Sequence, residues 1–156
     1  PRDFPFHQTL SATPLFIPLG NFSADYERTL GIRGLTGGVS GTYNTTTQLY
    51  PRRDRWAKGR LMYYPGGVAL DGFGIGVAVG AHRAERRHDE DPAVVLAHDG
   101  AATLGAIATY NYFFGPRQRL FFGPGFGIDR VLKSVPVNSP LSSTYYEVRA
   151  SLGIAL

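Results

Sequence analysis

The sequence predicts an all-β fold, an eight-stranded antiparallel up-and-down transmembrane β-barrel formed by residues 1–156 as a single domain. Three observations predict it. Apolar and polar residues alternate over long stretches, short and long connections alternate along the chain, and there is no run of 18 apolar residues from which a membrane-spanning helix could form. The 20 glycines, 10 phenylalanines and 9 tyrosines suit strands and turns, so we expect essentially no helix.

Eight segments carry the expected strands, at 6–18, 21–29, 33–45, 55–65, 71–84, 100–114, 119–132 and 144–156. The link near Gly20–Asn21 joins the first segment to the second; it is tight, although its place in the barrel is on the external side, where the links are long. The turn-like stretch from Leu30 to Gly34 separates the second and third segments, and a longer polar link precedes the fourth.

The fifth and seventh segments alternate apolar residues with glycine. The apolar rows are Phe73, Ile75, Val77, Val79 and Ala81 in the fifth, and Phe122, Pro124, Phe126 and Ile128 in the seventh. Because proline cannot donate a ladder hydrogen bond, we expect a local irregularity or bulge at Pro124.

The eighth segment keeps its alternation up to the last residue, over a length that suits the roughly 9–11 residues with which a strand crosses a bilayer. Its apolar row is Tyr146, Val148, Ala150, Leu152, Ile154 and Leu156, and its other row is Tyr145, Glu147, Arg149, Ser151, Gly153 and Ala155. We expect the apolar rows of the barrel to face lipid, with Val77, Val79, Ala106, Ala108, Phe126, Ile128, Leu152 and Ile154 among them.

The connections alternate in length, as they do in outer-membrane barrels. Short links follow the second, fourth and sixth segments, and long polar links follow the third, fifth and seventh, at 45–54, 85–99 and 133–143. An even number of strands then places both chain ends on the side of the short links, which in an outer membrane is the periplasmic side.

Aromatic residues lie near both ends of the predicted strands, as in the girdles at the two bilayer interfaces. Tyr63, Tyr64, Phe73, Tyr110, Tyr112, Phe114, Phe121 and Phe122 lie beside the short links, and Tyr43, Tyr50, Trp56, Tyr145 and Tyr146 lie beside the long ones. The alternative is the aromatic core of a soluble barrel such as a lipocalin, which would point these rings inward.

In each predicted strand, the row of residues that alternates with the apolar row would face the lumen. Acids and bases lie in this inward row. These are Asp25, Glu27, Lys58, Arg60, His82, Asp129, Glu147 and Arg149. Side chains fill the interior of an eight-stranded barrel, and isolated buried charges are costly, so we expect a connected ion-pair network with room left for it by inward glycines. A narrow gated pore or proton path is the alternative.

The net charge of +4 does not indicate a nucleic-acid partner, because the charges are not grouped with stacking aromatics on one segment. We expect partners in the outer-membrane lipid and lipopolysaccharide, whose phosphates would accept charge-assisted hydrogen bonds, and in a protein held by the loops or the barrel wall. The residues expected at this surface are Arg52, Arg53, Arg55, Arg86, Arg87, His88 and Asp89, with 84–99 as the main interaction loop.

An enzyme is the competing class, since some eight-stranded barrels modify lipid. Catalysis of that kind needs a nucleophile beside a general base, and none of the four histidines has an adjacent serine in the sequence. Without cysteine, thiolate chemistry is excluded. The sequence therefore predicts no catalytic residue, no cofactor and no metal site.

Three stretches carry a family resemblance, namely PLFIPLGNFSADYERTLG, KGRLMYYPGGVALDGFGIGVAVGAHR and ATYNYFFGPRQRLFFGPGFGIDR. The chain resembles small bacterial outer-membrane β-barrel proteins of the DUF3575-like type, related in shape to the OmpA transmembrane domain and to the OmpX and opacity-type barrels. The resemblance implies an outer-membrane location and offers no catalytic residues. We therefore expect a non-enzymatic outer-membrane protein, acting as a structural anchor or a surface-interaction module.

Overall fold

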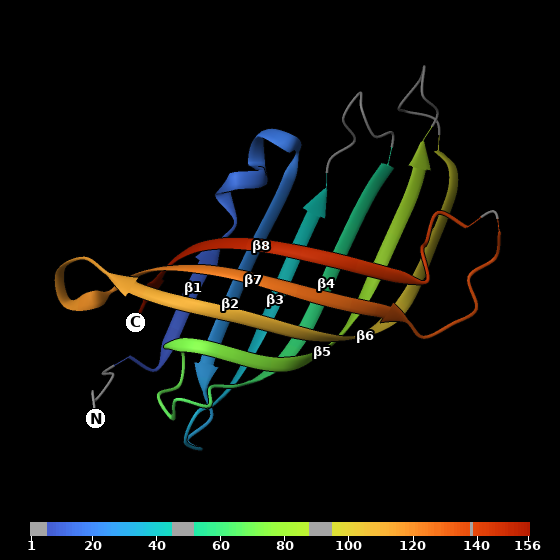
Figure 1. The fold of residues 1–156 in the computed structure, drawn as a ribbon. Helices are drawn as coiled ribbons and strands as arrows, with labels where there is room; N and C mark the ends of the chain where they lie inside the picture. Colours follow the sequence, from blue (N-terminus) through green and yellow to red (C-terminus); the bar gives the residue numbers. More distant parts are fainter. Residues whose placement is uncertain (1–5, 45–51, 88–94, 138) are drawn as a thin grey trace.

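The computed structural model describes residues 6–44, 52–87, 95–137 and 139–156, and it is a closed barrel of eight antiparallel strands in sequence order (Figure 1). The predicted all-β, up-and-down architecture is confirmed. The strands are β1 (Gln8–Ala12), β2 (Asn21–Thr29), β3 (Leu35–Asn44), β4 (Arg52–Tyr63), β5 (Gly72–Arg87), β6 (Val95–Phe114), β7 (Leu120–Val131) and β8 (Thr144–Ala155).

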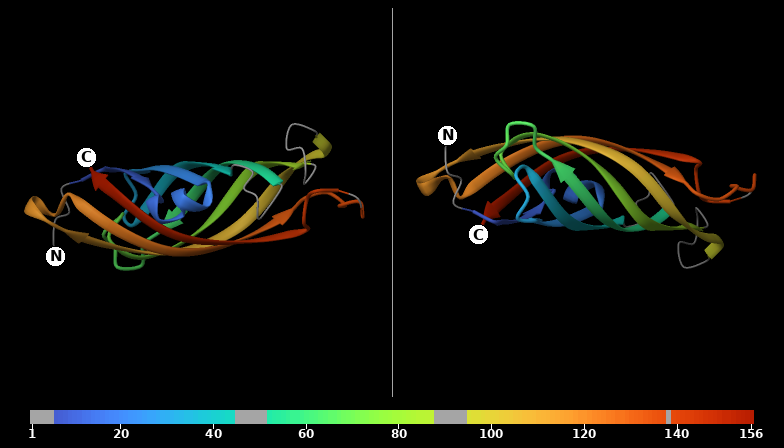
Figure 2. Two further views of the ribbon diagram at one scale, coloured as in Figure 1. Left: turned by 90° about the horizontal axis from the view of Figure 1, so that it is seen from above. Right: turned by 90° about the horizontal axis from the view of Figure 1, so that it is seen from below.

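Pairing of the first strand with the last closes the barrel, in the register Leu10 opposite Ile154. The start of β1 and the C-terminal residue Leu156 lie at the end of the barrel that carries the short links, as expected (Figures 1 and 2). At this end the amide of Leu156 donates to the carbonyl of Gln8 over 2.9 Å.

The first predicted strand is wrong beyond Ala12. Residues Pro14–Leu19 form a short 3₁₀ helix, η1, which connects β1 to β2 at the long-loop end. Pro14 and Pro18 have no amide hydrogen to give to a strand ladder, so the chain leaves the sheet here. The tight link expected at Gly20–Asn21 is thus the end of a longer connection. A second 3₁₀ turn, η2 (Pro116–Gln118), lies between β6 and β7.

Strands β4, β5 and β6 extend further toward the long loops than predicted. Arg52 and Arg53 belong to β4, Arg86 and Arg87 belong to β5, and β6 begins at Val95, so much of the predicted loop 84–99 is a hairpin. Alternation of apolar and polar residues stops here, but cross-strand pairing continues: Arg53 lies opposite Glu85. Arg52 opposite Arg86 and Arg55 opposite Arg83 are like-charged pairs, so backbone pairing and not charge complementarity continues these strands.

The ladder between β6 and β7 is interrupted where Pro124 was expected to disturb it. Pairs run in one register from Thr103 opposite Val131 to Thr109 opposite Gly125, and they resume with Tyr112 opposite Phe122. The register is the same before and after this interruption. The irregularity is therefore the loss of pairing at two successive positions, and no extra residue forms a bulge. The hydroxyl of Thr109 donates to the carbonyl of Pro124 over 3.2 Å.

The predicted division between outer and inner faces is confirmed. Val77 and Val79 are 52% and 58% exposed on the outer wall, whereas Asp25 and Asp129 on the inner wall are 3% and 2% exposed. All eight lipid-facing candidates lie on the outer phase, and Ala108 and Ile128 are the more covered of them. A broad belt of exposed apolar side chains surrounds the barrel and includes Leu10, Val39, Leu61, Ile75, Leu104, Phe126, Val148 and Leu152.

The aromatic bands are only partly as predicted. Six rings near the short links do point outward: Tyr63, Phe73, Tyr110, Tyr112, Phe114 and Phe122. Tyr64 and Phe121 are buried inside the barrel, at 0% and 4% exposure. Because successive side chains of a strand point to opposite faces, only one ring of each adjacent pair, Tyr63–Tyr64 and Phe121–Phe122, can face outward. At the other end, Trp56 also lies on the inner phase, beside Tyr145. Tyr50 lies outside the described residues.

Candidate functional site

The middle of the lumen is crossed by a layer of ion pairs. The carboxylate of Asp25 accepts from Arg60 over 2.9 Å and also from Arg149. Arg60 reaches a second acid, Glu27, over 3.2 Å, and Arg149 lies 2.9 Å from Glu147. Each of these residues comes from β2, β4 or β8, so the layer joins strands on facing sides of the barrel.

Lys58 extends the layer to β7. Its ammonium group lies 2.5 Å from Asp129 and 2.7 Å from Glu147, and both Lys58 and Asp129 are almost fully buried. The structure thus brings seven of the eight predicted lumenal residues into one connected network. When all seven are ionised, it contains four carboxylates and three cations.

Hydrogen bonds continue the network toward the short links through residues that were not predicted to belong to it. Glu27 accepts from the hydroxyl of Tyr64 over 2.7 Å and from the hydroxyl of buried Thr36. Asn111 donates to the Tyr64 oxygen over 3.2 Å and to the carbonyl of Leu70 over 2.9 Å. The only sign of these partners in the sequence was that each is a polar residue at an inward-facing position of its segment.

The eighth predicted residue, His82, belongs to a neighbouring cluster. Its Nε2 lies 3.1 Å from Asp54, and its ring stacks on Trp56 with 4.0 Å between centroids. Tyr145 meets the His82 ring edge-on at 4.4 Å. Lys58 lies 4.4 Å from the centroid of the Trp56 ring, so this cluster contacts the ion-pair layer through a cation–π interaction.

Inward glycines make the room that these long side chains need, as predicted. A Cβ at Gly105 would lie 2.3 Å from the nearer Asp129 oxygen, and a Cβ at Gly80 would lie 2.8 Å from Lys58. Only residues without a side chain allow the network to fill the lumen at these two positions.

Between the ion pairs and the short links, the lumen is closed by apolar side chains. Met62, Tyr64, Ala78 and Ile107 form one buried cluster, and Phe113, Phe121 and Ala155 form another beside the chain ends. Between this floor and the ion pairs there is a void of only about 20 Å³, lined by Asp25 and Ser11 among others. A void of this size holds about one water molecule.

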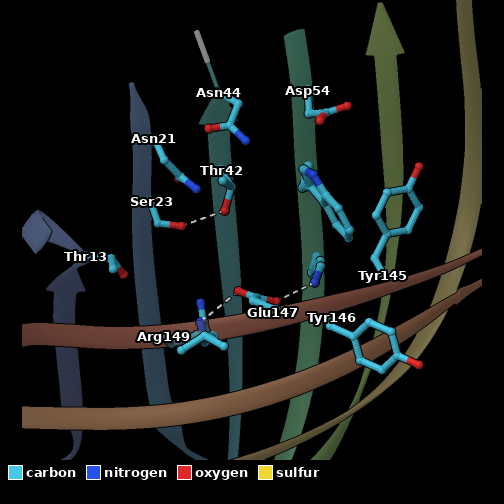
Figure 3. Close-up of a pocket in the computed structure, with 13 residues that line it drawn as sticks. Thr13, Asn21, Ser23, Thr42, Asn44, Asp54, Tyr145, Tyr146, Glu147 and Arg149 are labelled. Carbon is cyan, nitrogen blue, oxygen red and sulfur yellow. Dashed lines mark hydrogen bonds and ion pairs between the residues drawn. The ribbon is translucent and has the colours of Figure 1, made fainter. Parts of the chain in front are cut away.

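Between the ion pairs and the long loops there is a cavity of about 250 Å³, which Figure 3 shows. Small neutral polar residues line it from the residue after β1, from β2 and from β3: Thr13, Asn21, Ser23, Thr42 and Asn44. Asp54, Trp56 and Lys58 line it from β4, and Tyr145 to Arg149 line it from β8. Ser23 and Thr42 share a hydrogen bond of 2.6 Å across its wall.

The predicted surface arginines do not form one site with the lumen. Arg53 and Arg55 lie on the outer wall beside Tyr43, with their guanidinium carbons 5.9 Å and 5.5 Å from its ring centroid. Arg86 is exposed on the β5–β6 extension. Arg52 and Arg87 lie in strands, but the structure does not describe their side chains, and His88 and Asp89 lie outside the described residues.

A charged clamp holds the connection between β7 and β8. Asp99 accepts from Lys133 and, over 2.7 Å, from the hydroxyl of Ser139. These two hydrogen bonds lower the pKa of Asp99 to about 2, from an ordinary value of 3.8. The clamp lies beyond the last pair between β6 and β7, on the long-loop side.

Within the described ranges, no group of three or more His, Asp or Glu side chains is arranged to hold a metal ion. No helix there has the length and apolar character needed to span a membrane.

The geometry defines the class of structure as a closed eight-stranded up-and-down β-barrel with a charged, ion-paired lumen. This is the fold that the resemblance to OmpX-type barrels implied. Comparisons of the chain with profiles of known families, with curated proteins and with solved structures found no match.

Proposed function

We propose that this protein is a non-enzymatic barrel of a bacterial outer membrane, acting as a structural anchor or a surface-interaction module. The observation that carries the proposal is the belt of exposed apolar side chains around the barrel, opposite a lumen full of paired charges. An apolar exterior and a polar interior suit a barrel whose solvent is lipid. In water, a patch far larger than the few hundred Å² found on soluble monomers would stay exposed.

Closure of the lumen argues for an anchor and against a pore. An ion would have to pass the ion-pair layer and then the apolar floor that contains Met62 and Phe121. A proton path would need to continue through the same floor. A narrow pore is therefore the less favoured role.

The end of the barrel with the long loops carries features that suit interaction with partners. Arg53, Arg55 and Arg83 lie on the outer face of the extended strands, next to the apolar belt. Guanidinium groups at this level suit the phosphates of lipopolysaccharide. The extension of β4 to β6 projects beyond the other strands and offers a surface to a protein partner.

Membrane insertion is tested with a single tryptophan moved to the outer wall. Ala106→Trp in a Trp56→Phe background, refolded into vesicles of brominated phosphatidylcholine, should lose most of its fluorescence relative to unbrominated vesicles. Equal fluorescence in both would contradict insertion. Cell fractionation should find the native protein in the outer membrane.

Planar-bilayer recording distinguishes the anchor from the pore. We expect no stable conductance from the purified protein, and a large, stable conductance would favour the pore. A partner that co-purifies from native membranes and is lost on deletion of residues 86–97 supports the interaction role.

The lipid-modifying enzyme is the alternative. His82 pairs with Asp54 but is packed between aromatic rings, and the residue is 1% exposed with no serine among the partners that the structure shows for it. Lipid A or phospholipid turnover by the purified barrel, abolished by His82→Gln, would establish the enzyme instead.

A further inference from the structure

The barrel wall is incomplete between β8 and β2 on the long-loop side. β1 pairs with β8 only from Leu152 to Ala155 and ends at Ala12. Among the described residues no strand pairs with that edge of β8 from Thr144 to Ser151, a length of roughly 25 Å. In Figure 1 only the C-terminal end of β8 lies beside β1. The 3₁₀ helix η1, which follows β1, contacts both β2 and β8.

The open edge exposes backbone hydrogen-bonding groups. Leu156 exchanges hydrogen bonds with Gln8 of β1, whereas the amide of Ala155 donates to Arg119 on the other side. Continuing this alternation, the N–H and C=O groups of Ala150, Val148 and Tyr146 point into the gap. Tyr146 and Val148 point outward and are 71% and 65% exposed.

The gap leads into the lumenal cavity. The side chains of Tyr146 and Val148 belong to the outer face of β8, yet both residues line the cavity. Figure 3 shows inward Glu147 and Arg149 beside them on the same strand. On the opposite side the cavity reaches Thr13, directly after β1, and Asn21, at the start of β2. The cavity therefore opens through the side of the barrel as well as toward the long loops.

A buried group in the opening has no partner. Thr13 is 5% exposed, and its hydroxyl makes no hydrogen bond with any described residue. A buried hydroxyl without a partner is destabilising, so this position favours a ligand or water that supplies one. Unpaired backbone groups facing lipid carry a similar cost, since the bilayer core offers no water.

We propose that this opening is a lateral entrance through which the cavity binds the uncharged, polyhydroxylated headgroup of a glycolipid while its chain stays in the bilayer. The inference rests on the proposed membrane location, because the opening faces lipid only in an inserted barrel.

The lining of the cavity selects this chemistry. Thr13, Asn21, Ser23, Thr42 and Asn44 are neutral side chains that donate and accept hydrogen bonds, as hydroxyl groups require. The cations Lys58 and Arg149 are already paired with carboxylates, which disfavours an anionic headgroup.

The volume and the flanks of the opening favour partial burial of the ligand. At about 250 Å³, the cavity is smaller than the roughly 300–1,000 Å³ that encloses a whole drug-sized ligand. It therefore admits a headgroup but not a chain. Apolar side chains for the chain lie on both flanks of the opening, with Val148 on one side and Ile17 and Phe22 on the other.

The fluorescence of Trp56 reports binding, because Trp56 is the sole tryptophan and lines the cavity. The full chain in phosphatidylcholine vesicles is titrated with octyl glucoside, at concentrations that leave the vesicles intact, and separately with free glucose and with octanoate. We expect a saturable change in Trp56 emission with octyl glucoside and none with the other two probes at equal concentration. An equal response to free glucose would show entry from the loop end and overturn the lateral entrance. An equal response to octanoate would overturn the neutral headgroup.

Two variants test the site itself. Ser23→Phe places a ring in the cavity and should abolish the response, whereas Ala106→Phe, on the outer wall away from the opening, should retain it. Should Ser23→Phe not fold, Thr13→Val removes only the unpaired hydroxyl and should weaken binding roughly fivefold, the equivalent of one hydrogen bond of about 1 kcal/mol. Wild-type affinity in both cavity variants would overturn the site.

Failure of this inference is distinguishable from failure of the proposed function, because the Ala106→Trp variant described above reports insertion without involving the cavity. If brominated lipid quenches that variant and the wild-type Trp56 emission responds to none of the probes, the barrel is inserted and only the lateral site is wrong. If brominated lipid leaves its fluorescence unchanged, the membrane location fails, and the lateral entrance fails with it.

Discussion

Removing the ammonium group of Lys58 is the sharpest test of the lumenal network. Asp129 is 2% exposed, and Lys58 is the ion-pair partner that the structure shows for it, at 2.5 Å. At an effective dielectric constant of about 20, two charges at that separation attract by about 7 kcal/mol before the cost of desolvation. Breaking a buried pair by deleting one member typically costs about 3–5 kcal/mol, because the other charge stays buried. We expect Lys58→Met to destabilise the barrel by that amount.

A double-mutant cycle isolates the interaction. Asp129→Asn alone should cost less than Lys58→Met, because Lys58 keeps Glu147 at 2.7 Å. The double variant should be more stable than the sum of the single effects predicts, by about 1–3 kcal/mol. The free energy of unfolding is measured from urea titrations in vesicles, followed by the β-sheet signal in circular dichroism, since Trp56 fluorescence would itself change with Lys58.

Two results would refute this reasoning. One is a cost of less than about 1 kcal/mol for Lys58→Met, which is the range of solvent-exposed pairs. The other is strict additivity in the cycle. Lys133→Met serves as the matched control, because it removes a lysine whose side chain is 41% exposed, and it should change stability much less.

Three further predictions concern other parts of the barrel. Val77→Arg, on the outer wall, should destabilise the inserted protein by about 2–4 kcal/mol if Val77 lies near the bilayer midplane, and an unchanged urea midpoint would contradict a lipid-facing position. Gly105→Ala should cost about 1–3 kcal/mol by overpacking the lumen, whereas Gly100→Ala, whose Cβ would meet its nearest atom at 3.5 Å, should cost less; equal urea midpoints would disprove the close packing. Because the pKa of Asp99 is lowered to about 2, its clamp should be intact above the ordinary pKa of 3.8 and should loosen as the pH falls toward 2. Hydrogen exchange of the β7–β8 connection measures this, and Asp99→Asn should show fast exchange already at pH 7.

The sequence determined the architecture because apolar and polar residues alternate with the two-residue period of a β-strand. Alternation along 71–84 and 144–156 assigned Val77 and Leu152 to the outer face and Glu147 to the inner face, and the structure agrees. Glycine on the inner phase predicted space for long charged side chains, which Gly105 confirms. These properties are local, so they need no knowledge of which strands are neighbours.

The tertiary structure decided everything that depends on register across the barrel. Which acid meets which base follows from the stagger of strands far apart in the sequence, so Asp25 could not be assigned to Arg60 and Arg149 in advance. The inward position of Trp56 beside His82 is of the same kind. Strand ends were also decided here, since β5 and β6 continue by pairing with each other after their alternation has stopped. The unpaired edge of β8 arises because β1 is short, and only closure of the barrel reveals that two strands of unequal length must meet.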